Sequence, residues 1–320
     1  MLTVLMATRN GSETLPAVLK SFEALDAPPC GWKLVVIDNG STDSTGKILR
    51  GFRHRLPLTD LIEPRVGKNY ALNTGLEHLE GDLAVFTDDD VFPSREWLVR
   101  LRESVDAHPD YSIFGGAIVP RWEVPPPAWV ERVDMYAAYS ITDPNLADGP
   151  ATRGTLFGPN LAFRADVFRQ GTRFDPSIGP RDENYPMGSE SELLHRLRRA
   201  GHKSWHVQRA RVEHFIDASH LSKEWVLKRA IRSGRGEYRL THALNPVPGR
   251  WPWYVCPRIV KRLFRIVRAS VTRNEEDLLL ARWELNFLVG HLIEARLVRG
   301  NLHKGNAVGG MTEERLCNLI

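Results

Sequence analysis

Short apolar runs alternate with segments of helical periodicity along the first part of the chain. Runs typical of buried strands cover residues 2–8, 33–38 and 83–87, and residues 60–63 predict a shorter strand. Between these runs the apolar residues recur every three or four positions, which predicts amphipathic helices, one of them over residues 67–79. The alternation predicts an α/β fold with a mostly parallel sheet and helices on both of its faces.

Three polar clusters begin where these predicted strands end. They are Thr8-Arg9-Asn10, Asp38-Asn39-Gly40-Ser41 and Asp88-Asp89-Asp90. Because ligands of such sheets bind outside the carboxyl ends of the strands, we expect the clusters to converge on one site. The first strand is not followed by GxGxxG, and GxxxxGK[ST] does not occur in the sequence, which disfavours a dinucleotide site or a P-loop.

The acidic triplet needs a compensating cation or hydrogen-bond donors. Three adjacent carboxylates repel one another, and a hard divalent ion such as Mg²⁺ or Mn²⁺ relieves the repulsion with oxygen ligands. The alternative is a solvated acidic turn that leads into a helix capped by Ser94. Ser12 is likewise expected to cap the helix that follows the first strand.

Several segments carry a resemblance to a known family. VVIDNGSTDST, GKNYALNTGL and LAVFTDDDVFP are followed in order by GPNLAFRADVF, GTRFDPSIG and GSESELLHRLRRAGHKSWHVQRARVEH. Over residues 1–215 the chain resembles the family-2 glycosyltransferases, which have the Rossmann-like GT-A fold of nucleotide-diphospho-sugar transferases. The resemblance implies transfer of a sugar from a nucleotide-sugar donor to an acceptor hydroxyl of a glycan or a lipid-linked molecule.

The resemblance also implies roles in donor binding. Thr8 and Arg9 should lie against the nucleotide, and Asp38 should accept a hydrogen bond from a ring N–H, which is compatible with uridine or thymidine. Lys68 should lie near the base or the diphosphate, with Asn73 supporting its loop. The alternatives are that Asp38 only caps the next turn and that Lys68 is a solvated lysine at a helix start.

A metal site is implied by the same alignment. Asp88 would reach the ribose, or the metal through water, and Asp90 would bind Mn²⁺ or Mg²⁺. Asp89 holds the variable middle place of the family's DxD motif and is assigned to donor binding. His214 would approach the metal or the diphosphate, although a lone histidine at a strand end is more often structural.

The catalytic base is where the sequence departs from the family. The family commonly has Glu-Asp at a helix start, whereas this segment reads Ser189-Glu190-Ser191-Glu192. The alignment places Glu190 at the position of the base and implies a single displacement with inversion, while Glu192 has the spacing to form a capping box with Ser189. Because the acidic pair is missing, a non-catalytic nucleotide-sugar or glycan-binding protein is the alternative. Asn160 and the loop 175–187 are expected to border the acceptor or sugar pocket, the loop as a lid.

Charge is concentrated in one block. Residues 195–273 contain 19 Lys and Arg against 4 Asp and Glu, although the whole chain has a formal net charge of only +4. Such a block attracts polyanions or an anionic membrane, or it offsets acidic residues across an internal interface. We expect no nucleic-acid partner, because no aromatic and basic interleaving or known motif accompanies the charge.

The last third predicts helices. Residues 222–239 predict a helix followed by a glycine-containing turn, from which Arg232 and Arg235 would reach donor phosphates or an anionic acceptor. Residues 245–257 predict a linker. The basic amphipathic helix 258–271 is expected to lie on a membrane surface, to pack on the core, or to form a homodimer interface with a second helix, 278–298.

These observations predict a division of the chain and a location. We expect a GT-A domain over residues 1–220, with a nucleotide-binding half (1–110) and an acceptor-binding half (111–220), followed by a basic helical extension over 221–320. The processive QxxRW pattern is absent from the sequence, so one sugar per encounter is expected. No signal peptide is predicted, and the three scattered cysteines suit a reducing compartment, so the expected location is cytoplasmic, with peripheral attachment at the inner membrane face as an alternative.

Overall fold

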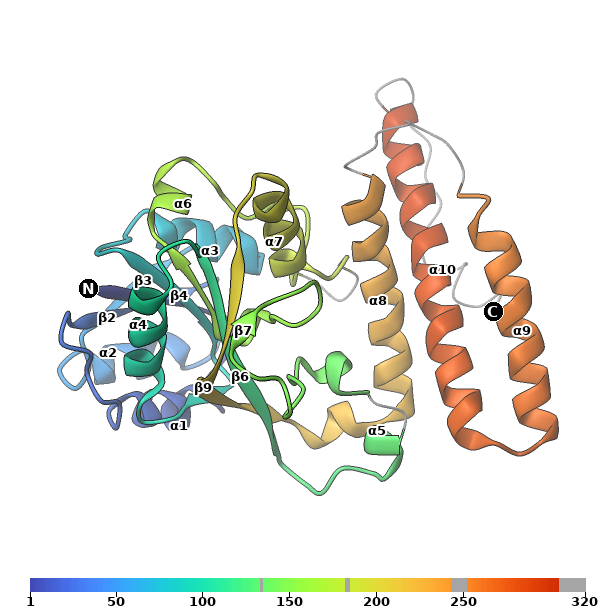
Figure 1. The fold of residues 1–320 in the computed structure, drawn as a ribbon, viewed down its shortest axis with the longest axis horizontal. Helices are drawn as coiled ribbons and strands as arrows, with labels where there is room; N and C mark the ends of the chain where they lie inside the picture. Colours follow the sequence, from blue (N-terminus) through green and yellow to red (C-terminus); the bar gives the residue numbers. More distant parts are fainter. Residues whose placement is uncertain (133–134, 182–184, 243–251, 305–320) are drawn as a thin grey trace. The chain divides into compact units, whose positions relative to one another are not determined.

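The chain forms two compact units, Met1–Arg229 and Ala230–Ile320. The computed structural model describes residues 1–132, 135–181, 185–242 and 252–304 of them (Figure 1). The first unit is an α/β domain, and the described part of the second unit is helical. Each unit is described separately below.

A nine-stranded sheet forms the centre of the first unit. Its order is β3-β2-β1-β4-β8-β6-β9-β5, and β7 pairs with β9. The four strands nearest the N-terminus pair in parallel, as predicted, whereas β8 runs antiparallel to both β4 and β6. The strands are β1 (Leu2–Thr8), β2 (Trp32–Asp38), β3 (Leu58–Ile62), β4 (Leu83–Asp88), β5 (Val91–Pro93), β6 (Ile113–Trp122), β7 (Gly149–Pro150), β8 (Leu161–Arg164) and β9 (Ser204–Ile216).

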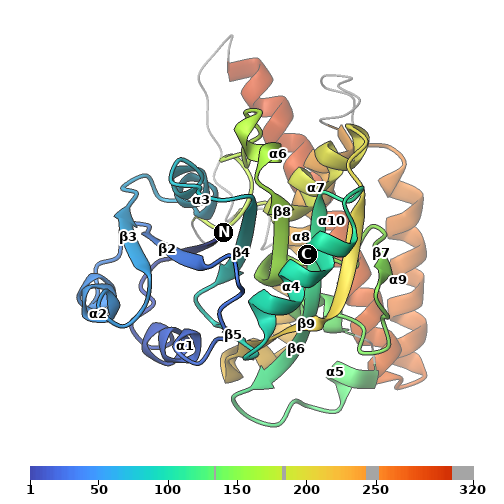
Figure 2. The ribbon, with the colours of Figure 1, turned by 60° about the vertical axis from the view of Figure 1, so that its left-hand side comes forward.

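Helices cover both faces of this sheet, which confirms the predicted α/β fold (Figure 2). Successive strand side chains point to opposite faces, so Val4 and Met6 enter one core while Leu5 and Ala7 enter the other. The first core is completed by α1 (Leu15–Phe22), α2 (Thr45–Phe52) and α4 (Trp97–Ala107), and the second by α3 (Lys68–Leu76), α6 (Asp166–Arg169) and α7 (Ser189–Arg199). The shorter helical elements are α5 (Trp129–Arg132), η1 (Met135–Tyr139), η2 (Gly158–Asn160) and η3 (Ala218–Leu221).

The strand register aligns the predicted polar clusters at one edge of the sheet. Thr8 at the end of β1 lies opposite Asp38 of β2, and Ala7 lies opposite Asp88 of β4. A second register brings His214 into the same region, because β5 follows the acidic triplet and pairs Val91 with His214. The ends of several strands therefore lie together where the sequence predicts a ligand site.

The predicted serine caps are wrong. The N-cap residues of α1 and α4 are Thr14 and Glu96, and neither helix has a side-chain cap. Ser12 is instead held through its backbone N–H, which donates to Asp43 Oδ2 at 3.1 Å. Asp43 therefore fixes the loop before α1, and no side chain caps the helix itself.

Three long helices follow. They are α8 (Lys223–His242), α9 (Val255–Val271), which begins within the predicted linker, and α10 (Glu275–Lys304).

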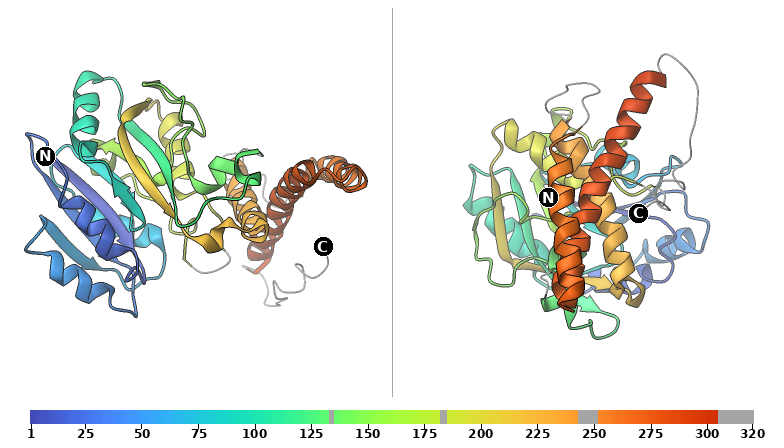
Figure 3. Two further views of the ribbon diagram at one scale, coloured as in Figure 1. Left: turned by 90° about the horizontal axis from the view of Figure 1, so that it is seen from below. Right: turned by 90° about the vertical axis from the view of Figure 1, so that its right-hand side faces the viewer.

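The predicted turn at Gly234 is wrong, because α8 continues through this residue. A Cβ at Gly234 would lie 1.9 Å from the carbonyl oxygen of Phe287, so the glycine lets α10 approach closely. Residues 245–251 of the predicted linker lie outside the described residues. Helix α9 packs along α10 (Figure 3).

None of the helices in the described part of the chain is both long and apolar enough to cross a membrane.

Candidate active site

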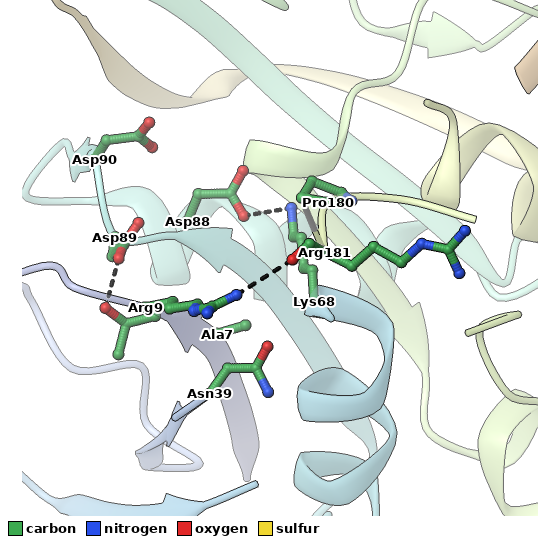
Figure 4. Close-up of a pocket in the computed structure, with 10 residues that line it drawn as sticks. Ala7, Arg9, Asn39, Lys68, Asp88, Asp89, Asp90, Pro180 and Arg181 are labelled. Atoms are coloured by element: carbon green, nitrogen blue, oxygen red, sulfur yellow. Dashed lines mark hydrogen bonds and ion pairs between the residues drawn. The ribbon is translucent and has the colours of Figure 1, made fainter. Parts of the chain in front are cut away.

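A pocket opens at the edge of the sheet where the polar clusters meet (Figure 4). It brings together the predicted donor-binding residues Thr8, Arg9 and Lys68 with the acidic triplet. Among the described residues, the lining is Ala7, Thr8, Arg9, Asn39, Lys68, Asp88, Asp89, Asp90, Pro180 and Arg181.

Lys68 joins this pocket to Glu190, the predicted catalytic base. Its Nζ lies 2.7 Å from Asp88 Oδ1 and 3.1 Å from Glu190 Oε1. Lys68 begins α3, directly after Gly67, whose φ of 142° suits a residue without a Cβ. Glu190 lies in the first turn of α7 and is only 22% exposed. One ammonium group therefore contacts carboxylates from two distant elements of the first unit.

The opposite charges of these residues shift the pKa values of Lys68 and Glu190. Burial alone would lower the pKa of Lys68, but the charges of Asp88 and Glu190 outweigh it and raise the pKa. Burial would raise the pKa of Glu190, but the Lys68 ammonium outweighs this effect and holds the pKa below its usual value. Glu190 is therefore an anion at neutral pH, the form that a general base requires.

The three aspartates point in different directions. Asp88 faces Lys68, whereas Asp89 Oδ2 accepts a hydrogen bond from Thr8 Oγ1 at 2.5 Å (Figure 4). Burial and the neighbouring charge of Asp90 raise the pKa of Asp89 to about 7. The middle aspartate thus links the triplet to the end of β1.

Asp90 lies beside His214, as the sequence predicts for a metal site. The His214 Nε2 is 3.4 Å from Asp90 Oδ2, and its Nδ1 is 2.8 Å from the carbonyl oxygen of Tyr139. Because a carbonyl oxygen only accepts, Nδ1 carries a proton and Nε2 faces the carboxylate. Burial lowers the pKa of His214, but the Asp90 charge outweighs it and raises the pKa overall.

The donor set around Asp90 suits a divalent cation. Asp90 Oδ1 is buried and has no hydrogen-bond partner among the described residues, and the imidazole of His214 lies beside the same carboxylate. No group of three His, Cys, Asp or Glu within the described ranges has the arrangement of a metal site, and Asp88 is engaged with Lys68. The residues present therefore fit an ion held by one or two protein ligands, with substrate oxygens completing its coordination.

Asn39 is a site residue that the sequence reasoning did not assign. Its buried amide Nδ2 donates to the carbonyl oxygens of Glu63 at 3.0 Å and Arg65 at 2.8 Å, and its Oδ1 accepts from the Gly67 N–H at 2.7 Å. These bonds fix the segment that presents Lys68. The only sequence signal was its place in a polar cluster after a strand.

Asp38 does not line the pocket in the described structure. Its Oδ1 accepts a hydrogen bond from the backbone N–H of Ser41 at 2.8 Å. The turn-holding role that the sequence left open is therefore present, and it occupies one of the two carboxylate oxygens.

The described part of the predicted lid is tied to α3. The backbone N–H of Lys68 donates to the Pro180 carbonyl at 2.8 Å, and Asn69 Nδ2 donates to the carbonyls of Asp175 at 2.7 Å and Ile178 at 2.9 Å. The Arg181 carbonyl accepts from Arg9 at 3.2 Å. This segment forms a wall of the pocket; residues 182–184 of the predicted lid lie outside the described residues.

Two predicted supporting roles on this side of the domain are wrong. Gly188, not Ser189, is the N-cap of α7, and Glu192 contacts Arg196 at 2.5 Å instead of completing a capping box. Asn73 supports residue 174 and not its own loop, because its amide exchanges hydrogen bonds of 2.8 and 2.9 Å with the backbone of Phe174.

Asn160 has a structural role in place of the predicted acceptor contact. It is fully buried, its Nδ2 donates to the carbonyls of Ala117 at 3.0 Å and Ala210 at 2.8 Å, and its Oδ1 accepts from the Trp97 indole at 2.9 Å. The amide thus joins three elements, β6, β9 and α4.

The predicted role of Arg235 as a ligand of phosphate or of an anionic acceptor is also wrong. Its side chain is 6% exposed, and its Nε donates at 2.8 Å to Glu294, a fully buried residue of α10. Arg235 is therefore part of the interior of the second unit and is not a phosphate ligand. Arg232 lies in the second unit as well, and its predicted role stays a prediction.

The sequence is similar to those of known proteins. The model of a family described as Glycosyl transferase family 2 matches residues 3–172. The chain is 22% identical over 229 residues to the glucosyl-dolichyl phosphate glucuronosyltransferase of Haloferax volcanii, covering 70% of each chain. It is 26% identical over 230 residues to the succinoglycan biosynthesis protein ExoM of Rhizobium meliloti, covering 71% of each.

Solved structures share the fold. The mannosyltransferase PcManGT of Pyrobaculum calidifontis, in complex with GDP-Man and Mn²⁺, has a TM-score of 0.55 at 19% identity, over 95% of this chain and 79% of that one. Residues 1–349 of Staphylococcus aureus TarS, in complex with UDP-GlcNAc, have a TM-score of 0.53 at 14% identity, over 98% and 94%.

Proposed function

Because this chain belongs to glycosyl transferase family 2, we propose that it transfers a sugar from a UDP- or dTDP-type donor to a hydroxyl group of a glycan or lipid-linked acceptor, with inversion and one sugar per encounter. The observation that carries the proposal is the Lys68 ammonium, which contacts the strand-end acid Asp88 and the buried Glu190 together. The names of two relatives support the acceptor class, since one modifies a dolichyl phosphate-linked sugar and the other serves succinoglycan biosynthesis.

Two cationic side chains of the pocket lie where they could bind the donor diphosphate. Arg9 and Lys68 both line the pocket, and cations bind phosphate oxygens through charge-assisted hydrogen bonds. Asp38 Oδ1 is used by Ser41, which leaves Oδ2 to accept the ring N–H of uracil or thymine. Asp88 and Asp89 complete the donor side, and Thr8 orients Asp89.

Glu190 acts as the base in this proposal. A carboxylate at the first turn of α7 is stabilised as an anion by the helix dipole, and Lys68 adds to that stabilisation. Glu190 would accept the acceptor proton while the hydroxyl oxygen attacks the anomeric carbon from the face opposite the leaving diphosphate. The family and the relatives favour this enzyme over a non-catalytic binding protein, although the usual Glu-Asp pair is missing.

Asp90 and His214 are the residues that would hold Mn²⁺ or Mg²⁺, with Asp88 on the donor side. The buried, partnerless Oδ1 of Asp90 and the imidazole beside it support this assignment, as does the Mn²⁺ in the PcManGT complex. A bound divalent ion supplies charge stabilisation for the departing diphosphate.

Nucleotide binding tests the metal assignment. We expect calorimetric titration to show that UDP or dTDP binds about tenfold or more tightly with Mn²⁺ than with EDTA, and that Asp90→Asn strongly reduces this difference, because it replaces an anionic ligand with a neutral amide. Asp110→Asn, at an exposed position outside the pocket, is the matched control and should keep it. Nucleotide affinity that is the same with Mn²⁺ and with EDTA in the unmodified chain would contradict the metal assignment.

A further inference from the structure

Helix α9 exposes a continuous apolar stripe. Val260, Leu263, Phe264, Val267 and Val271 recur at intervals of three and four residues, which places them on one side of the helix. All five are exposed, and Phe264 and Val271 reach 73% and 79%. Isolated exposed apolar residues are ordinary, but a contiguous stripe marks an interaction surface.

The opposite side of α9 carries its charge and faces α10. Arg265 lies 2.5 Å from Asp277 and 3.0 Å from Glu284, and Arg262 also contacts Glu284. Ala269 is buried on this same side. The helix therefore has its charged side turned toward a neighbouring helix and its apolar side turned outward, the reverse of a helix on the surface of a water-soluble domain.

We propose that this outward face of α9 inserts into the interface of an anionic phospholipid bilayer. The proposal rests on the proposed function for its purpose, because a lipid-linked acceptor lies in such a bilayer. Helix α9 would lie in the plane of the interface, since no helix of the described residues is suited to span a membrane.

The charges beside the stripe fit lipid phosphates. Residues 255–273 contain six Lys and Arg and no Asp or Glu. Lys261 and Arg268 are exposed and lie seven residues apart, so they flank the stripe on the same side of the helix. Of the two, Arg268 also lies 3.3 Å from Asp277 of α10, so Lys261 is the main cation beside the stripe. Trp253, which is 70% exposed, precedes the helix, and tryptophan is enriched at membrane interfaces. Cations and an aromatic ring beside an apolar stripe form the pattern of an interfacial helix.

A second copy of the chain fits this face less well. A two-fold interface places the same patch on both copies, so the apolar stripe would meet itself. Lys261 would then lie near its own counterpart, and residues 255–273 contain no acid to offset it, whereas Arg268 is partly offset by Asp277 of α10, 3.3 Å away. Like charges at such an interface are unfavourable, whereas an anionic surface neutralises them.

Co-sedimentation of the full chain with vesicles tests the proposal without any donor. We expect binding to phosphatidylcholine vesicles that contain phosphatidylglycerol, weaker binding at high salt, and little binding to phosphatidylcholine alone. The double variant Phe264→Ser/Val267→Ser should lose about tenfold or more in binding, because two exposed apolar anchors are removed. Lys261→Glu should also weaken binding, and Val124→Ser, at a 43% exposed position in the first unit, should not.

Three results would overturn the proposal. The first is that the unmodified chain does not bind anionic vesicles, and the second is that the double variant binds them equally well. The third is that sedimentation velocity shows a dimer that dissociates in the double variant. Titration of the same samples with UDP and Mn²⁺ separates this outcome from a failure of the proposed function, because nucleotide binding uses residues of the first unit and requires no vesicle.

Discussion

Lys68 connects the two chemical roles of the site. Its ammonium contacts Asp88 on the proposed donor side and Glu190, the proposed base, at 2.7 and 3.1 Å. Without this cation both carboxylates would be buried next to each other's charge, which disfavours the anionic form of each. The residue therefore controls the protonation of the proposed base as well as the charge of the donor pocket.

Lys68→Gln should move the pH dependence of turnover. The charge of Lys68 holds the pKa of Glu190 below its usual value against the opposing effect of burial, so its loss should raise that pKa. The acid limb of the kcat profile should shift to higher pH by about one unit or more, since an opposite charge at this range changes a pKa by about 1–3 units. The measurement is kcat against pH for both proteins.

Lys33→Gln provides the matched control for that profile. Lys33 also forms a short ion pair, 2.6 Å from Glu80, but it lies outside the pocket. Its profile should coincide with that of the unmodified chain. An unchanged acid limb in Lys68→Gln would contradict the assignment of Glu190 as the titrating base.

At the scale of elements, one glycine, Gly179, positions the loop that precedes α7. Gly179 has a φ of 94°, and its N–H donates to the Pro186 carbonyl at 2.8 Å. A Cβ at this position would lie 2.0 Å from Ser189 Oγ at the start of α7. The loop can therefore close against the helix that carries Glu190 only with glycine here.

Gly179→Ala should destabilise the fold more than Gly171→Ala. Both glycines have a φ of 94°, so both substitutions incur the left-handed backbone cost of about 1–2 kcal/mol. Only at Gly179 does the new methyl group meet another side chain, which adds about 1–3 kcal/mol, because no atom lies within 4 Å of a Cβ at Gly171. The free energy of unfolding in urea checks this order; equal losses would contradict the described loop packing.

At the scale of the whole molecule, the repeating patterns were predictable and the long-range partners were not. The apolar runs gave the strands because their residues are buried on both faces, and the strand ends then located Asp38 and the acidic triplet, whereas Lys68 was assigned through the family resemblance. Arg235 was misassigned because its partner Glu294 is 59 residues away in sequence. Asn160 was misassigned for the same reason, since its partners belong to different elements.

The basic block illustrates the same limit. Charge counting left open whether it binds a polyanion or offsets acids inside the protein. Part of the basic block offsets acids inside the protein, because Arg239 contacts Glu294 at 2.5 Å and Arg265 contacts Asp277 of α10. Composition could not identify α10 as the source of these acids, nor show which side of α9 faces outward.

Turnover by Glu190→Gln is the most direct test of the central claim, that Glu190 deprotonates the acceptor of a sugar held at the strand ends. The substitution should lower kcat by about 10²–10⁴-fold, because it removes the base, and leave the Kd of the nucleotide sugar within a few-fold. Glu192→Gln on the same helix, where Glu192 contacts only Arg196 in the described ion pairs, should retain turnover. If Glu190→Gln turns over like the unmodified chain, or if Glu192→Gln is the inactive variant, the account is contradicted.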